Sequence, residues 1–147
     1  MKKPDAFLRA VAQENGFALD EQYAVGNVFL SRDETTAAAT RQQFGQPIGD
    51  FQMVQQMIAD SAMEIFATRM MVLNTAWEVD QGLDPRDKVS MVKVQASEML
   101  GRVADRGIQI FGGYGFTKEL PLERIYRDAR VTRIYDGTSE VHRMLIA

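Results

Sequence analysis

Residues 50–81 read DFQMVQQMIADSAMEIFATRMMVLNTAWEVDQ, and this stretch carries the strongest structural signal in the chain. Apolar residues recur in it at steps of three and four positions, namely Val54, Met57, Ile58, Ala62, Ile65, Val72, Ala76 and Val79. That spacing is the period of an α-helix. The pattern predicts one helix of about 30 residues, or about 45 Å. A helix of this length is typical of a helix bundle, and Gly82 is expected to end it.

A second long helix is predicted after a short connection. Asp84 is suited to cap it, and Pro85 is suited to its first position. Apolar residues then keep the helical spacing as far as Phe111, namely Val89, Val92, Ala96, Met99, Leu100, Val103 and Ile110. Because the connection is short, the two long helices are expected to be antiparallel neighbours. Methionines are spread over both helices, and their flexible side chains are expected to fill the core.

The segments after these helices are shorter. Residues 112–116, GGYGF, form a loop by composition. Pro121 is expected to begin a short helix, and Thr138 or Ser139 is expected to cap a final one. Together the elements predict an all-α fold, an up-and-down four-helix bundle.

Composition limits the classes of function. The 147 residues are 46% apolar, which suits one globular domain and excludes a disordered chain. The 17 basic and 20 acidic side chains give a formal charge of −3, which argues against nucleic-acid binding. No apolar run is long enough to span a membrane, and the first residues do not form a secretory signal. Cysteine is absent, which fits a reducing compartment, and a cytoplasmic location is expected.

Few side chains have the spacing of a catalytic or metal site. His142 is the only histidine, and the nearby Glu140 is two positions from it rather than three or four, so no metal site is expected. Asp136 precedes a predicted helix and is followed by Gly137, which allows a ligand to approach closely. The Asp136 carboxylate is either a general base or a helix cap. The glycines of 112–116 likewise either bind a ligand or end a helix.

Four motifs then follow one another along the chain. They read RQQFGQPI at 41–48, QIFGGYGF at 109–116, YRDAR at 126–130 and IYDGTSE at 134–140. This order of motifs resembles the carboxy-terminal helical domain of the acyl-CoA dehydrogenases. The resemblance implies the same helical bundle for residues 41–147. Residues 1–40 are then a divergent, partly helical segment, in which Asp33 could cap a helix that runs to Phe44.

The resemblance implies a flavoenzyme of fatty acid metabolism. Enzymes of this family remove an α proton from an acyl-CoA thioester with a carboxylate and pass the β hydrogen to FAD as a hydride. Asp136 matches the position of that carboxylate and would be the catalytic base. The other matching positions contact the cofactor or the substrate. Arg41 and Phe44 would contact the FAD of a neighbouring subunit, and Gln109 and Gly113 would line the ADP portion of that FAD. Thr138 and Glu140 would lie beside the flavin, and Gly137 would lie beside the substrate.

Two differences from the family pattern bear on function. Aspartate replaces the usual glutamate at position 136, which shortens the reach of the carboxylate by about 1.5 Å. The family's amino-terminal helical domain and middle β domain have no counterpart in these residues, so a truncated member is expected. Three hypotheses follow. The first is an FAD-dependent acyl-CoA dehydrogenase or its carboxy-terminal part, and the second is a non-catalytic oligomerisation or partner-binding module. The third is a flavin oxidase of the same superfamily that uses Asp136 as base, as the nitroalkane oxidases use an aspartate.

The same resemblance gives the expected partners. They are the acyl-CoA substrate, further copies of the chain in a dimer or tetramer, and a chain that supplies the missing domains. Surfaces that face the missing domains are expected to be apolar and to drive association. The interface is expected on the two long helices, residues 50–81 and 85–111.

Overall fold

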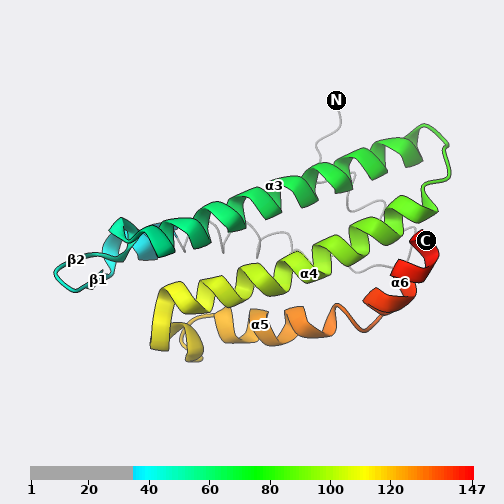
Figure 1. Cartoon of the computed structure of the whole chain (residues 1–147). Helices are drawn as coiled ribbons and strands as arrows, with labels where there is room; N and C mark the ends of the chain where they lie inside the picture. Colours follow the sequence, from blue (N-terminus) through cyan, green and yellow to red (C-terminus); the bar gives the residue numbers. More distant parts are fainter. Residues whose placement is uncertain (1–34) are drawn as a thin grey trace.

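The computed structural model describes residues 35–147, and most of them are helical (Figure 1). The elements are β1 (Gln42–Gln43), β2 (Gln46–Pro47), η1 (Ile48–Asp50), α3 (Gln52–Asp80), α4 (Arg86–Phe111), η2 (Gly112–Phe116), α5 (Leu122–Val131) and α6 (Ser139–Ile146). The predicted all-α class is confirmed. The prediction for residues 1–40 falls mainly on 1–34, which lie outside the described residues. Among residues 35–147, no helix has both the length and the apolar character needed to cross a bilayer.

The two long helices agree with the sequence prediction. They contain 29 and 26 residues and are joined by a short turn at Gly82, whose φ is 73°. The N–H of Gly82 donates to the carbonyl O of Val79 at 2.9 Å, and the N–H of Leu83 donates to that of Glu78 at 3.1 Å. This is the Schellman pattern, which requires a left-handed residue after the helix. Gly82 therefore ends α3, as predicted.

The predicted cap of α4 is wrong. Pro85, not Asp84, directly precedes the helix, with φ −96° and ψ 33°, and no side chain caps the helix there. The Asp84 carboxylate instead accepts a hydrogen bond from Nε of Arg86 at 3.0 Å. The Asp84 carboxylate therefore pairs with the exposed guanidinium of Arg86 and does not cap the backbone N–H groups at the start of α4.

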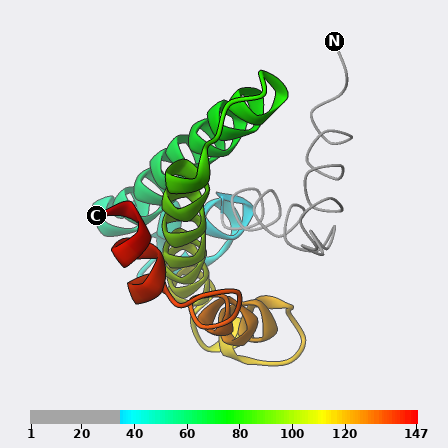
Figure 2. The same cartoon turned by 90° about the vertical axis from the view of Figure 1, so that its right-hand side faces the viewer.

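Helix α4 is the centre of the fold. α3 packs along one side of it, and α5 and α6 follow one another along another side (Figure 1, Figure 2). The main core joins the second half of α4 to α5 and consists of Met99, Leu100, Val103, Leu122 and Ala129. A second core lies where the first described residues meet the end of α4 and consists of Ala38, Ile48 and Ile110. Helices α3, α5, α6 and η2 therefore all pack on α4.

The face of α3 that meets α4 carries small polar side chains. Ser61, Thr68 and Thr75 are buried at intervals of seven residues, and Ser90 and Ser97 are buried on α4. The Thr75 hydroxyl donates to the carbonyl O of Met71 at 2.9 Å, and the Ser97 hydroxyl donates to that of Val94 at 3.2 Å. The hydroxyls of Thr75 and Ser97 are thus satisfied within their own helices, whereas Thr68 accepts from Nε2 of Gln95 on α4 at 3.4 Å. Short side chains at the contact also allow the two helix axes to approach closely.

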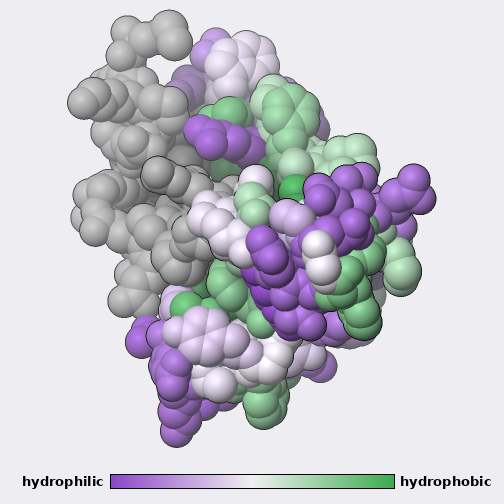
Figure 3. Space-filling view, turned by 90° about the vertical axis from the view of Figure 1, so that its left-hand side faces the viewer, coloured by the Kyte–Doolittle hydropathy of each residue, from purple (hydrophilic) through white to green (hydrophobic). Residues whose placement is uncertain are grey.

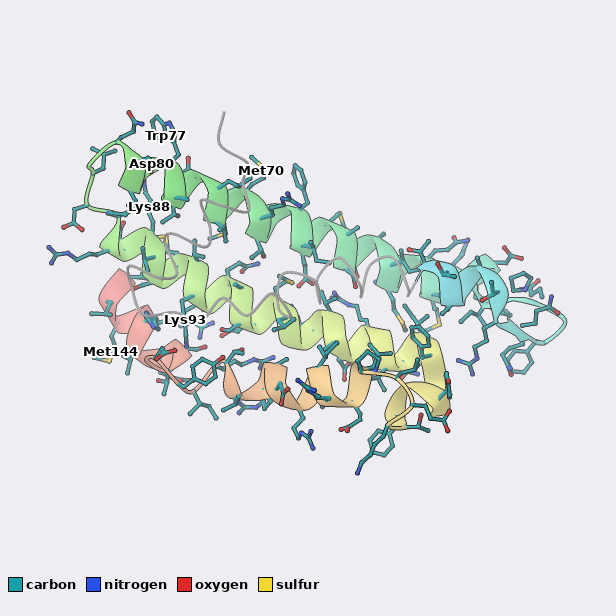
Figure 4. All side chains as sticks on the ribbon, turned by 180° about the vertical axis from the view of Figure 1, so that it is seen from behind. Met70, Trp77, Asp80, Lys88, Lys93 and Met144 are labelled. Carbon is teal, nitrogen blue, oxygen red and sulfur yellow. The ribbon has the colours of Figure 1, made fainter. Side chains whose placement is uncertain are left out.

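The prediction that the methionines fill the core is wrong for most of those described. Met99 is buried, whereas an exposed set comprises Met53, Met63, Met70, Met91 and Met144. Phe66 and Trp77 are exposed as well. Figure 4 shows Met70 and Trp77 projecting from the side of α3 that faces away from α4. The reason is that α3 has apolar residues on more than one side, and α4 covers only one of them.

Two short segments also differ from the prediction. The helix at residues 35–40 ends before Phe44, and β1 and β2 form a hairpin with Gln43 opposite Gln46. Phe44 and Gly45 both have positive φ, 54° and 82°, as the two central residues of a type I′ turn require. The predicted loop at 112–116 is the 3₁₀-helix η2. A Cβ on Gly115 would lie 2.9 Å from Cβ of Phe111, so glycine allows η2 to fold back tightly onto α4.

Candidate functional site

The predicted site residues form two groups at opposite ends of α4. The hairpin group comprises Arg41, Phe44, Gln109 and Gly113, near the carboxyl end of α4, and the turn group comprises Asp136, Gly137, Thr138 and Glu140, near its amino end (Figure 1). Gln109 and Lys93, which contacts the turn group, are 16 positions apart on α4. At 1.5 Å per residue this is about 24 Å. The structure therefore does not bring all eight residues together within one chain.

In the hairpin group, Arg41 lies against the end of α4. Its Nη1 donates to the carbonyl O of Ile110 at 2.8 Å, so the cation satisfies a carbonyl that the helix leaves without an internal partner. A Cβ on Gly112 would lie 2.6 Å from Nη1 of Arg41, and the φ of Gly112 is 63°. Gly112 therefore leaves room for the guanidinium. Next to it, Gly113 is exposed, and a Cβ there would meet no atom within 4 Å.

A groove of about 220 Å³ lies between the hairpin and the start of α3. Its lining includes Arg41, Phe44, Phe51 and Gln109. Phe44 is 95% exposed at the tip of the hairpin, and its ring meets that of Phe51 edge to face, with centroids 6.2 Å apart. Figure 3, which views the molecule from this end, shows hydrophobic and hydrophilic groups interspersed over the surface. The Arg41 guanidinium and the open backbone of Gly113 form a donor set that suits a nucleotide diphosphate, with the exposed ring of Phe44 beside them.

In the turn group, Asp136 is exposed and has the left-handed φ of 54°, and Gly137 follows with 91°. The alternative in which Asp136 caps α6 is wrong, because the cap is Thr138, whose Oγ1 accepts from the N–H of Val141 at 3.3 Å. The prediction that Thr138 or Ser139 caps this helix is confirmed. The Asp136 carboxylate is therefore not used to begin the helix.

Glu140 lies in the first turn of α6 and is exposed. Its own backbone N–H and the Thr138 hydroxyl hold the pKa of the Glu140 carboxyl below its ordinary value. Arg143 and Arg130 add a smaller effect in the same direction. A second groove, of about 180 Å³, lies between α4, α5 and α6. It is lined by Thr138, Glu140, Glu98, Arg130, Arg133, Ile134 and Ser139.

Sequence reasoning missed the side chains that hold the turn group. Lys93 and Ser90 lie on α4, more than 40 positions before Asp136, and His142 lies on α6. Lys93 Nζ donates to the carbonyl O of Gly137, and His142 Nε2 lies 3.0 Å from that of Asp136. Figure 4 shows Lys93 on the stretch of α4 beside α6. Burial lowers the pKa of the Lys93 amine, against the opposing effect of the Asp136 and Glu140 charges.

Comparisons with known proteins show which family this chain belongs to. The sequence profile described as "Acyl-CoA dehydrogenase, C-terminal domain" matches residues 30–147. A second profile, described as class-II glutamine amidotransferases, matches residues 1–53, which is less than half of the chain.

The probable acyl-CoA dehydrogenase YngJ of Bacillus subtilis (strain 168) is 45% identical over 125 residues, which cover 84% of this chain and 33% of YngJ. The caffeyl-CoA reductase-Etf complex subunit CarC of Acetobacterium woodii is 44% identical over 110 residues, which cover 75% of this chain and 29% of CarC. Among solved structures, the FAD complex of PigA has a TM-score of 0.84 at 32% identity, over 96% of this chain and 37% of PigA.

The chain spans about a third of the length of these relatives. The profile match covers both long helices and all eight predicted site residues. With α3, α4, η2, α5 and α6 in the predicted order, the chain belongs to the acyl-CoA dehydrogenase family, whose carboxy-terminal domain it matches.

Proposed function

We propose that this chain forms the helical part of an FAD-dependent oxidoreductase site that acts on the CH–CH group of acyl-CoA thioesters, with Asp136 as the base. The observation that carries the proposal is the Asp136–Gly137 turn. It presents an exposed carboxylate from a left-handed backbone. Membership of the acyl-CoA dehydrogenase family supports the reaction class.

Asp136 would accept the α proton of the thioester at a carboxylate oxygen. This proton is weakly acidic, so the base has to be held close to it and away from bulk water. In the described residues Asp136 is exposed. Bound substrate and a neighbouring chain would therefore exclude the water.

The residues of the hairpin group fit FAD. The Arg41 guanidinium has five donors, of which Nη1 serves Ile110, so others are available for a diphosphate. Gly113 would present open backbone to the ADP portion, beside Gln109. In the turn group, Thr138 and Glu140 would lie beside the flavin. FAD, when bound, supplies the acceptor for the β hydrogen as hydride.

The separation of the two groups supports a site shared between chains. About 24 Å of α4 lies between them, so Arg41 and Phe44 would contact the FAD of a neighbouring subunit while Asp136 serves another site. A homo-oligomer, together with a chain that provides further domains, would complete each site. CarC is named as a subunit of an Etf complex, so the proposal includes an Etf-type partner that takes up the electrons.

The test uses the assembly that the chain forms with the proteins encoded beside it. Turnover is measured with a panel of acyl-CoA substrates and a dye as electron acceptor, and bound flavin is measured by absorbance. We expect flavin absorbance, and for Asp136→Asn a loss of turnover of at least about a hundredfold. Asp105→Asn removes an exposed carboxylate of α4 outside both groups and should leave turnover unchanged.

The outcomes separate the alternatives. Unchanged turnover with Asp136→Asn would overturn the assignment of the base. An assembly with neither flavin nor turnover would point to the non-catalytic module. A further variant, Arg41→Ala, should weaken the binding of FAD without removing Asp136, so it tests the hairpin group separately.

A further inference from the structure

Side chains from two helices hold the Asp136–Gly137 turn. His142 of α6 lies with Nε2 3.0 Å from the carbonyl O of Asp136 and Nδ1 3.1 Å from Oγ of Ser90. Lys93, about one turn after Ser90 on α4, donates from Nζ to the carbonyl O of Gly137. Two consecutive carbonyl groups of the turn are thus each fixed by a side chain that is itself carried by a helix.

The two contacts of His142 require one tautomer. A backbone carbonyl can only accept, so Nε2 has to carry the hydrogen that is donated to Asp136. In the neutral ring Nδ1 then has a free lone pair, and the Ser90 hydroxyl donates to it. Ser90 is 4% exposed, so water has little access to this hydrogen bond. The two hydrogen bonds are therefore donated in one direction, from Ser90 to His142 and from His142 to Asp136.

The conformation that these contacts hold is an uncommon one for aspartate. Residues other than glycine are strained at positive φ and stay there when the surroundings fix them. Glycine at position 137 allows the contact between His142 and Asp136, because a Cβ at position 137 would lie 2.8 Å from Nε2 of His142. A change of φ at Asp136 to the extended region would move the carbonyl groups of Asp136 and Gly137 away from His142 and Lys93. It would also turn the Asp136 carboxylate to a different direction.

We propose that Lys93, His142 and Ser90 are positioning residues, which hold the Asp136–Gly137 turn in the left-handed conformation and so fix the direction of the Asp136 carboxylate. The consequence for turnover rests on the proposed function, in which Asp136 is the base. The consequence for the backbone rests on the contacts alone. The two can therefore be tested separately.

The first test is NMR of the full chain labelled with ¹⁵N. Because the chain has a single histidine, its ring signals need no assignment. The ring nitrogens should show the tautomer with the hydrogen on Nε2, and the HN–Hα coupling of Asp136 should correspond to a positive φ. His142→Leu and Lys93→Met should each shift this coupling toward the value for an extended backbone. Lys118→Met, at an exposed lysine of the loop before α5, is the matched control and should change neither signal.

His142→Gln is the conservative variant. Its amide can donate to the carbonyl O of Asp136 and accept from Ser90, so the coupling of Asp136 should keep its wild-type value. If the His142 side chain only filled space, His142→Leu would also keep the wild-type coupling of Asp136. A hydrogen on Nδ1, or a positive φ at Asp136 that survives both His142→Leu and Lys93→Met, would overturn the proposal whatever the activity is.

The second test is turnover of the assembly. His142→Leu and Lys93→Met should lower kcat by up to about a hundredfold and leave KM nearly unchanged, and His142→Gln should restore kcat. If Asp136→Asn keeps full turnover, the proposed function fails while the NMR result still decides the conformational part. If Asp136→Asn is inactive but Lys93→Met and His142→Leu keep full kcat, the positioning role is overturned.

Discussion

The substitution Gly137→Ala tests the turn group through stability. Alanine at a φ of 91° costs about 1–2 kcal/mol in a left-handed backbone. The new Cβ would lie 2.8 Å from Nε2 of His142, so the ring has to move and its hydrogen bond to Asp136 is lost. The loss of one such bond costs about 0.5–1.5 kcal/mol. Together these give a destabilisation of about 1.5–3.5 kcal/mol.

Thermal and urea unfolding of the full chain measure this change. In a protein of this size, 1 kcal/mol lowers Tm by about 2–4 °C, so we expect a decrease of about 3–14 °C. The chain contains two matched controls. Gly82→Ala has the strain of a φ of 73° but meets no atom within 4 Å, and Gly113→Ala has neither strain nor contact. The order of stability should be Gly113→Ala, Gly82→Ala and then Gly137→Ala.

The difference between Gly137→Ala and Gly82→Ala isolates the contact with His142. Combination of Gly137→Ala with His142→Leu should cost less than the sum of the two single changes, since both remove the same hydrogen bond. If Gly137→Ala is no more destabilising than Gly113→Ala, the left-handed turn described for residues 136–137 is refuted. If it equals Gly82→Ala, the argument from the imidazole contact is refuted.

Three further predictions concern the rest of the molecule. Burial alone would raise the pKa of Glu64, but hydrogen bonds from Arg106 and Arg102 outweigh it and hold the pKa of this carboxyl below its ordinary range. The stabilisation is thus present at neutral pH and lost as the pH falls below that ordinary range, so the free energies of unfolding of Glu64→Gln and wild type in urea should converge at acid pH. In sedimentation velocity, the chain should form dimers or larger species, and Met70→Lys with Trp77→Lys should yield monomers. The isolated chain should purify with sub-stoichiometric FAD by absorbance, because part of a site binds weakly; a one-to-one yellow protein would contradict this.

The long elements could be predicted from sequence because local chemistry determines them. The three- and four-residue spacing in α3 and the glycine at position 82 follow from helix geometry and backbone sterics alone. The burial of α3 could not be predicted in the same way. Its buried centre is Ser61, Thr68 and Thr75, whereas large apolar residues such as Phe66 are exposed. Which face meets α4 depends on how closely the helices approach, and apolar spacing does not carry that information.

The candidate site was predicted only in part for a similar reason. The family motifs indicated Asp136 and Arg41, but not the residues that hold Asp136. Lys93 lies 43 positions before Asp136, and only the fold brings the two close together. One signal was available, since Lys93 interrupts the apolar run of Val92 and Val94 on the predicted helix. The hairpin had no comparable signal, because phenylalanine is not a residue that favours a positive φ.

The central place of α4 has a consequence for the order in which the chain folds. α3 and α5 reach α4 through short connections, so these contacts close small loops and can form early. α6 has eight residues, too few for a helix that is stable alone, and its partners on α4 lie about 50 positions earlier. We therefore expect α6 to dock late, after its platform on α4 has formed. The Asp136–Gly137 turn would then be completed in the last step of folding, and slow steps of refolding should be followed best by the signal of His142.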